Sequence, residues 1–218
     1  DELAERARLI HNIGRVIGQP GYIHYILSSN YRLSEIQAAL LLSRLRKLPN
    51  EVKVKHENGK VLADMIRRTN VVEPTRSDDR VTTRGYYYFV LLYKPEELDN
   101  IPKEVFIEAL RAEGVPVGVS YGPPLYRQPA FRRENLAKSI PRYLLEKMPD
   151  YEKLNLPGAE EFARRELVLP HYLLLAPREA LELVVAAIEK IKEHVDELKP
   201  LADKFKVSDA TIDATYHR

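Results

Sequence analysis

The sequence contains no cysteine and no tryptophan, and it has only 2 methionines. Without cysteine, the chain can form neither a disulfide framework nor a metal site with thiolate ligands. The histidines that are present lack the spacing of metal ligands, so we expect no metal site. The absence of cysteine is typical of proteins in a reducing compartment, and we therefore predict a cytoplasmic location.

The chain also lacks a strong excess of charge and long apolar runs. Its formal net charge is +2 over 218 residues, so nothing in the overall charge predicts nucleic acid as a partner. The apolar runs are too short to cross a bilayer, and no membrane partner is expected. A content of 44% hydrophobic and 30% charged residues is typical of a globular chain that buries a core. The abundance of lysine, arginine and glutamate favours a heat-adapted source.

Helical patterns dominate the first part of the chain. Three apolar residues at helical spacing predict an opening amphipathic helix: Leu3, Ala7 and Ile10. This helix is expected to stop at Gly14. Residues 36–48 are apolar with little polar face, which predicts a helix that is buried on most sides. Pro49 is expected to interrupt it, and a second, more polar helix is expected over about residues 50–68.

The start of the apolar helix carries an unusual group of polar residues. Ser34 is a typical N-cap, and Gln37 stands where the returning arm of a capping box is found. Immediately before them lie Asn30, Tyr31 and Arg32, three large side chains with polar ends. The spacing alone favours the simple interpretation that these residues cap the helix and lie in solvent.

From about residue 70 onward, strand and helix patterns alternate, which predicts an α/β fold with a sheet covered by helices. The expected strands are residues 71–74, 85–93, 115–121 and 167–170. The expected helices are residues 102–113, 157–166 and 178–198.

These patterns divide the chain into three parts. Residues 1–48 resemble the remnant of a larger domain, because two helices and a loop cannot enclose so apolar a helix. Residues 49–198 are predicted to form a compact α/β domain. Residues 199–218 lack a sustained apolar period and are predicted to be a loose tail.

Several long strings of this sequence resemble one protein family. The strings are "NYRLSEIQAALLLSRLRKLP", "YYYFVLLY", "FIEALRAEGVPVGVSYGPPLYRQPAF" and "PGAEEFARRELVLPHYLLL", which occur in this order. Together they resemble the C-terminal half of the DegT/DnrJ/StrS sugar aminotransferases, over Asp1 to about Lys192. These strings are most similar to the branch of the family that contains aminohydroxybenzoate synthase and the glutamine:scyllo-inosose aminotransferases. The resemblance implies the C-terminal small domain of a type I PLP-dependent transferase, together with the last helices of its large domain.

The resemblance implies a second role for the residues before the apolar helix. In this family the asparagine and arginine of the "NYR" string reach across a homodimer interface to the pyridoxal 5'-phosphate (PLP) of the neighbouring subunit. Asn30 and Arg32 would accordingly bind cofactor, while Tyr31 is expected to pack. Family members often have a glycine and an aromatic residue before this string, whereas this chain has Ser28 and Ser29.

The substrate-side residues implied by the resemblance lie in the second half of the chain. Tyr121, Tyr126 and Gln128 belong to the proline-rich loop that faces the substrate in relatives. Packing over a domain boundary is an equally good interpretation of that loop. His171 is a further candidate, although a lone histidine after a strand more often has a structural role.

The sequence has no "GEGG" string, which follows the Schiff-base lysine in this family. We therefore expect that lysine upstream of Asp1 and assign no catalytic residue within the chain. The activity implied is transfer of an amino group from glutamate or glutamine to a keto-sugar or keto-cyclitol. The alternative is a non-catalytic module that binds sugar or PLP or assembles dimers.

Overall fold

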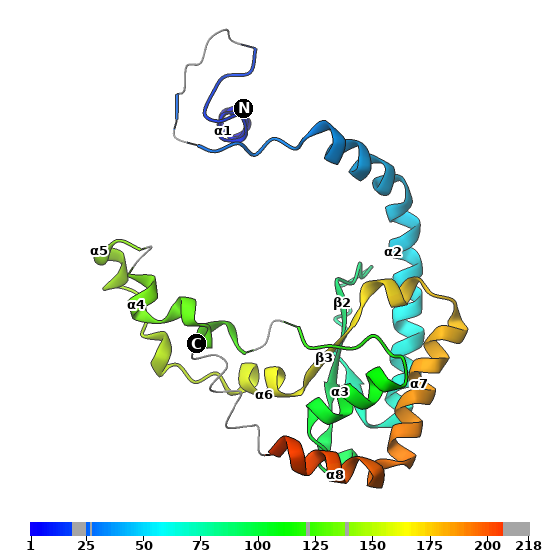
Figure 1. The fold of residues 1–218 in the computed structure, drawn as a ribbon. Coiled ribbons are helices and arrows are strands. Elements are labelled where there is room, and N and C mark those ends of the chain that lie inside the picture. Colours follow the sequence, from blue (N-terminus) through cyan, green and yellow to red (C-terminus); the bar gives the residue numbers. More distant parts are fainter. Residues whose placement is uncertain (19–24, 27, 121–122, 138–139, 207–218) are drawn as a thin grey trace. The chain divides into compact units, whose positions relative to one another are not determined.

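The computed structural model describes residues 1–18, 25–26, 28–120, 123–137 and 140–206 of the chain. The chain separates into two units, Asp1–Asn50 and Glu51–Arg218, and helix α2 has residues in both (Figure 1). Each unit is described by itself below.

The first unit begins with helix α1, Glu2–His11. The side chain of Asp1 caps it by accepting a hydrogen bond of 3.2 Å from the Leu3 amide. The helix ends before the predicted Gly14, which adopts a φ of +78° in the turn that follows. A Cβ atom at Gly14 would lie 2.0 Å from the carbonyl oxygen of Ile26, so only glycine fits this turn.

Helix α2, Glu35–Thr69, begins with the predicted capping box. The Gln37 amide donates to the Ser34 hydroxyl at 3.3 Å, and the Ser34 amide donates to the Gln37 side chain at 3.2 Å. The helix continues through Pro49, so the predicted break there is wrong. Proline has a φ that suits a helix, but it lacks the amide that would bond to the Leu45 carbonyl, and its ring crowds that carbonyl. The turns on either side keep their own hydrogen bonds, and the helix remains continuous.

The apolar face of α2 is exposed in the single chain, so its predicted burial, against a second subunit or another domain, stays a prediction. Ile36 is 77% exposed, Leu41 57% and Leu45 58%. The first unit offers too few elements to cover this face. Exposed leucines in such number are unusual for a surface that meets only water.

The second unit is built on a three-stranded antiparallel sheet in the order β1-β2-β3. Its strands are β1 (Val72–Pro74), β2 (Tyr88–Tyr93) and β3 (Glu166–Pro170). Burial alternates along β2, as expected for a sheet with one face in the core. Three of the predicted strands are confirmed. The fourth, at residues 115–121, contributes only the bridge from Gly118 to Val168 within the described part of the chain, because Pro116 has no amide for a ladder.

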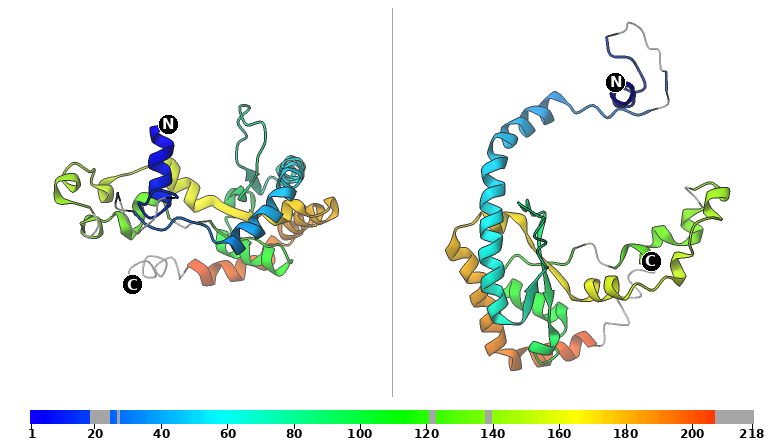
Figure 2. Two further views of the ribbon diagram at one scale, coloured as in Figure 1. Left: turned by 90° about the horizontal axis from the view of Figure 1, so that it is seen from above. Right: turned by 180° about the vertical axis from the view of Figure 1, so that it is seen from behind.

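Helices cover this sheet. The longer ones are α3 (Lys103–Ala112), α6 (Pro157–Arg165), α7 (Arg178–Glu193) and α8 (Val195–Lys206). Shorter turns are η1 (Pro95–Glu97), η2 (Leu125–Arg127), η3 (Pro129–Phe131), α4 (Arg133–Leu136), α5 (Arg142–Leu145), η4 (Tyr151–Lys153) and η5 (His171–Leu175). Helix α7 runs beside the part of α2 that belongs to this unit, as all three views show (Figures 1 and 2).

The core joins the buried sheet face to these helices. Leu62 and Ile66 of α2, Phe106 of α3 and Leu181 of α7 are each fully buried. The ring of Tyr93 stacks on Phe106 with centroids 4.8 Å apart, and its hydroxyl donates to the Ile101 carbonyl at 2.8 Å. Burial raises the pKa of the Tyr93 hydroxyl, so it remains a proton donor.

The end of the chain corrects two predictions. The last predicted helix breaks at His194, and the first residues of the predicted tail are helical, because α8 extends to Lys206. Ala202 is 5% exposed, and Lys199 pairs with Asp99 at 2.9 Å. These contacts with the core order a segment whose own apolar pattern is short. The remainder of the predicted tail lies outside the described residues.

Candidate functional site

Asn30 and Arg32 lie together in the segment between α1 and α2. The Asn30 Oδ1 accepts from the Arg32 amide at 3.1 Å and from the Arg32 Nε at 3.1 Å. Both side chains are exposed. The pairing uses the oxygen of the Asn30 amide, which leaves its NH2 group as a donor beside the outer nitrogens of the guanidinium. Such a set of donors fits a phosphate dianion.

The segment that carries this pair is attached to the end of α1. Asn30 forms an isolated β-bridge with Asn12, and the Tyr31 amide donates to the His11 carbonyl at 3.3 Å. The Ser28 hydroxyl donates to the Ile10 carbonyl at 2.6 Å. Ser28, which departs from the family pattern, thus helps to hold the segment in place.

Tyr31 is not packed in the described part of the chain. Its side chain is 65% exposed in the single chain, so the expectation that it packs stays a prediction. Within the first unit, Tyr31 is thus a surface residue, like Asn30 and Arg32 beside it. Its neighbours on the chain, Asn30 and Arg32, remain the predicted cofactor ligands.

Tyr126 occupies η2 in the second unit and is 8% exposed. Its hydroxyl donates a short hydrogen bond to the Glu160 carboxylate of α6 and accepts from the Leu156 amide at 3.3 Å. Arg127 Nε donates to the same carboxylate at 2.8 Å. The Tyr126 hydrogen bond, followed by the Arg127 one, holds the pKa of Glu160 below its usual range. In this arrangement the Tyr126 hydroxyl is hydrogen-bonded within the chain, and its ring remains available to line the cavity.

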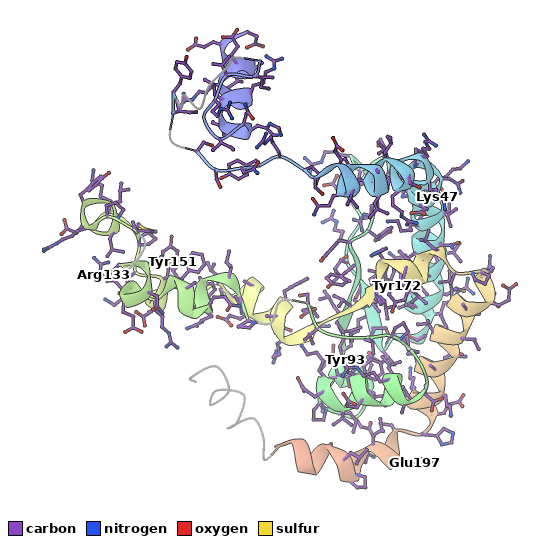
Figure 3. All side chains as sticks on the ribbon, turned by 45° about the horizontal axis from the view of Figure 1, so that its top comes forward. Lys47, Tyr93, Arg133, Tyr151, Tyr172 and Glu197 are labelled. Carbon is purple, nitrogen blue, oxygen red and sulfur yellow. The ribbon has the colours of Figure 1, made fainter. Side chains whose placement is uncertain are left out.

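A cavity of about 490 Å³ lies behind this loop. Tyr126, Tyr151 and Phe162 contribute aromatic walls, and Glu166 is among the few polar residues of the lining. Tyr151, labelled in Figure 3, comes from η4 and meets Phe131 edge to face with centroids 5.1 Å apart. The cavity is therefore a partly open, apolar space bordered by the proline-rich loop, η4 and α6.

Glu166 was not identified as a site candidate from the sequence. It is 1% exposed and accepts from the Ser120 amide at 3.0 Å and 3.2 Å through its two oxygens. Lys103 is the nearby cation: its Nζ donates to the Ala163 carbonyl at 3.0 Å. Burial lowers the pKa of Lys103, and the charges of Glu166 and Glu104 oppose that shift. The sequence feature that could have indicated Glu166 is its position as the first residue of an otherwise apolar strand.

Replacing Glu166 with alanine is expected to destabilise the chain by about 1–3 kcal/mol, because the half-buried Ser120 amide loses its acceptor. The measurement is urea unfolding at neutral pH. Glu108→Ala is the matched control, since Glu108 makes only an exposed pair with Arg111, and it is expected to change stability by less than about 1 kcal/mol. Equal midpoints for the Glu166 variant and the unchanged chain would contradict the structural role assigned to this carboxylate.

The remaining predicted substrate-side residues are placed differently. Gln128 is half-buried, and its carbonyl accepts from the Phe131 amide at 2.9 Å. His171 is exposed at the start of η5, with its ring 6.2 Å from the Tyr172 ring. The described lining of the cavity beside Tyr126 comes from residues 120–166, so His171 does not join it. Tyr121 lies outside the described residues.

Other kinds of site were sought within the described ranges. No group of three or more His, Asp or Glu side chains that could hold a metal ion occurs among those residues. In the same part of the chain, no helix is long and apolar enough to cross a membrane.

Residues 1–189 match the sequence profile of the DegT/DnrJ/EryC1/StrS aminotransferase family. The chain therefore belongs to this aminotransferase family, as its motifs predicted.

Two relatives illustrate the match. An L-glutamine:2-deoxy-scyllo-inosose aminotransferase of Streptomyces lividus is 30% identical over an alignment of 207 residues that covers 88% of this chain and 47% of the relative. An L-glutamine:scyllo-inosose aminotransferase of Streptomyces griseus is 29% identical over 178 residues, covering 79% of this chain and 41% of the relative. The chain thus spans less than half the length of these relatives.

Solved structures give the same fold. The crystal structure of 3-amino-5-hydroxybenzoic acid synthase superposes with a TM-score of 0.67 at 23% identity, covering 87% of this chain and 46% of that one. DesV of S. venezuelae superposes with a TM-score of 0.65 at 25% identity, covering 88% and 44%. The predicted α/β fold is confirmed by these comparisons.

Proposed function

We propose that this chain is the C-terminal part of a PLP-dependent aminotransferase that aminates a keto-cyclitol or keto-sugar, with glutamine or glutamate as donor. The observation that carries the proposal is the family match over residues 1–189. The names of the relatives support a cyclitol acceptor and glutamine as donor. The structure adds a paired Asn30 and Arg32 whose donors suit a phosphate.

In this proposal the Asn30 amide and the Arg32 guanidinium bind the cofactor phosphate in the active site of a second subunit. Asn30 also orients Arg32, because its oxygen holds both the Arg32 amide and Nε. When bound, PLP supplies the electron sink for the reaction. The loop with Tyr126 and Gln128 forms the acceptor-side wall, and His171 is a further substrate-side candidate. The Schiff-base lysine belongs to sequence outside these 218 residues.

The exposed face of α2 supports a partnership between two copies of the longer protein. Leu41, Leu45 and Leu48 are 57%, 58% and 45% exposed, and they follow Asn30 and Arg32 along the chain. Burial of such a face against a second subunit would place the donor pair near the partner's domain. We therefore propose a homodimer with shared active sites, and from composition we propose a cytoplasmic enzyme without nucleic acid or membrane as partner.

The proposal is tested on the full-length protein loaded with PLP. Glutamine or glutamate is expected to bleach the visible absorption of the bound cofactor, and a keto-cyclitol such as 2-deoxy-scyllo-inosose is expected to restore it. Bleaching by a donor without recovery with any keto-cyclitol or keto-sugar would reject the acceptor class. A protein that binds PLP and shows no change with either donor would instead be the non-catalytic binding module.

A further inference from the structure

Glu160 is the shared acceptor between α6 and the proline-rich loop. It lies in the first turn of α6 and accepts from the Tyr126 hydroxyl and from Arg127 Nε, two neighbours in η2. Leu156 is the N-cap of α6 and has no side-chain cap of its own. Its amide instead donates a hydrogen bond of 3.3 Å to the Tyr126 hydroxyl. One phenol therefore joins the start of α6 to η2, and one carboxylate holds that phenol.

Because Tyr126 is buried, its hydrogen bond to Glu160 stabilises one particular position of the loop. Tyr126 is 8% exposed, whereas Arg127 and Glu160 have side-chain exposures of 46% and 37%. An unpaired hydroxyl at the position of Tyr126 would be costly, since water reaches it poorly. The Arg127–Glu160 pair is half in solvent and contributes less on its own. The Tyr126–Glu160 hydrogen bond is thus the contact that distinguishes the observed position of the loop from others.

The same contact borders the cavity of about 490 Å³. Tyr126 and its predecessors Pro124 and Leu125 form one side of the lining, and Ala159 and Phe162 of α6 form another. If Tyr126 left Glu160, these two sides would no longer be held at a fixed separation.

We propose that Glu160 is a positioning residue that fixes residues 123–131 against α6 and thereby sets the wall of the cavity that Tyr126 lines. It acts through Tyr126 and Arg127. The inference rests on the proposed function only in one respect, namely that this wall faces the acceptor ketone. The attachment of the loop to α6 is a property of the chain by itself.

Hydrogen exchange of the 218-residue chain, followed by mass spectrometry, tests the attachment. Glu160→Gln keeps the shape of the side chain but removes its charge, so the amides of residues 125–128, 130, 131 and 156 are expected to exchange about 10- to 100-fold faster. The strands β2 and β3 are expected to keep their protection. Glu161→Gln is the matched control, because Glu161 is the next residue on α6 and pairs with Arg164 and Arg165. It is expected to leave the loop unchanged.

Unchanged exchange of the loop in Glu160→Gln would overturn the proposal, as would an equal increase in the loop and in the strands. Tyr126→Phe provides a second route if the first variant does not fold, since it keeps the ring and removes the hydroxyl. It is expected to open the same amides. If the double variant exchanges these amides no faster than either single variant, the two residues act through one shared hydrogen bond. An additive increase in exchange would contradict that.

The functional consequence is measured on the full-length enzyme. Glu160→Gln is expected to raise KM for the acceptor ketone by about 10-fold while leaving the rate of the donor half-reaction unchanged, because only the acceptor wall moves. Equal losses in both half-reactions, or no change in KM, would contradict the link from Glu160 to the acceptor. If the unchanged enzyme turns over no ketone, the proposed function fails, whereas the exchange result decides the positioning role separately.

Discussion

Replacing both Leu41 and Leu45 of α2 with glutamate is expected to weaken self-association of the full-length protein by about 100-fold or more. The two side chains lie one turn apart on the same face, and each is more than half exposed in the single chain. Burial of a leucine contributes about 1.5–3 kcal/mol, so loss of two corresponds to at least two orders of magnitude in the dissociation constant. Sedimentation equilibrium over a range of concentrations measures this constant.

Lys47→Glu is the matched control. Lys47 lies about 160° around the helix from Leu45, away from the side that carries Leu41 and Leu45, and is exposed (Figure 3). It receives the same new side chain without removing a leucine from that side, so association is expected to change little. Circular dichroism of each variant checks that helix content is kept. Dimers of unchanged affinity in the double leucine variant would show that this face is not the subunit interface.

Asn30→Ala in the full-length enzyme is expected to weaken PLP binding by roughly 10- to 100-fold. The substitution removes one hydrogen bond from a neutral donor to a charged phosphate, which is worth about 1.5–3 kcal/mol. It also frees Arg32, whose Nε is held by the Asn30 oxygen at 3.1 Å. Excess PLP is expected to restore the rate, because only cofactor affinity has changed. Fluorescence titration of the cofactor-free enzyme with PLP gives the affinity.

Arg32→Ala is expected to cost more than Asn30→Ala, and excess PLP is expected to rescue it less if the guanidinium also holds substrate. Arg32→Lys keeps the charge and removes the planar fork, so it separates charge from geometry. If the Asn30→Ala enzyme bound PLP with normal affinity, Asn30 would not be a cofactor ligand, and Asn30 and Arg32 would only cap α2. The Ser34→Ala variant is the control for that outcome, because Ser34 performs the capping with Gln37.

The sequence predicted the sheet well because its signals are local. Strand β2 forms within the run of aromatic and aliphatic residues that predicts it, and β3 follows α6 as expected. The failed strand at residues 115–121 shows the limit of this approach. Its residues have strand propensity, but Pro116 cannot donate, and among the described residues the segment pairs with β3 only at Gly118.

Helix boundaries were harder to predict because tertiary contacts decide them. Pro49 would end many isolated helices, yet α2 continues because Leu62 and Ile66 further along are locked into the core. Conversely, α8 forms where the apolar period is short, since Ala202 is buried and Lys199 pairs with Asp99. Neither contact can be read from a local pattern.

The candidate site was predicted in part. The pairing of Asn30 with Arg32 agrees with their grouping in one motif, since two residues so close in sequence readily share a hydrogen bond. Glu160 and Glu166 were missed because their partners, Tyr126 and Ser120, lie 34 and 46 residues away. A charged residue in an amphipathic pattern is normally assigned to solvent, and only the fold shows where it meets a partner.

Complementation between two inactive full-length subunits tests the central claim, that Asn30 and Arg32 serve the active site of the neighbouring subunit. One parent carries Asn30→Ala and Arg32→Ala, and the other lacks the Schiff-base lysine. Subunits are mixed, allowed to exchange, and assayed after heterodimers have been verified by native mass spectrometry. In each heterodimer one active site then carries both lesions and the other carries none. We expect activity to return, with about one intact site for every four subunits in a random mixture. Heterodimers that form and remain inactive would show that Asn30 and Arg32 act within their own subunit, which contradicts the account.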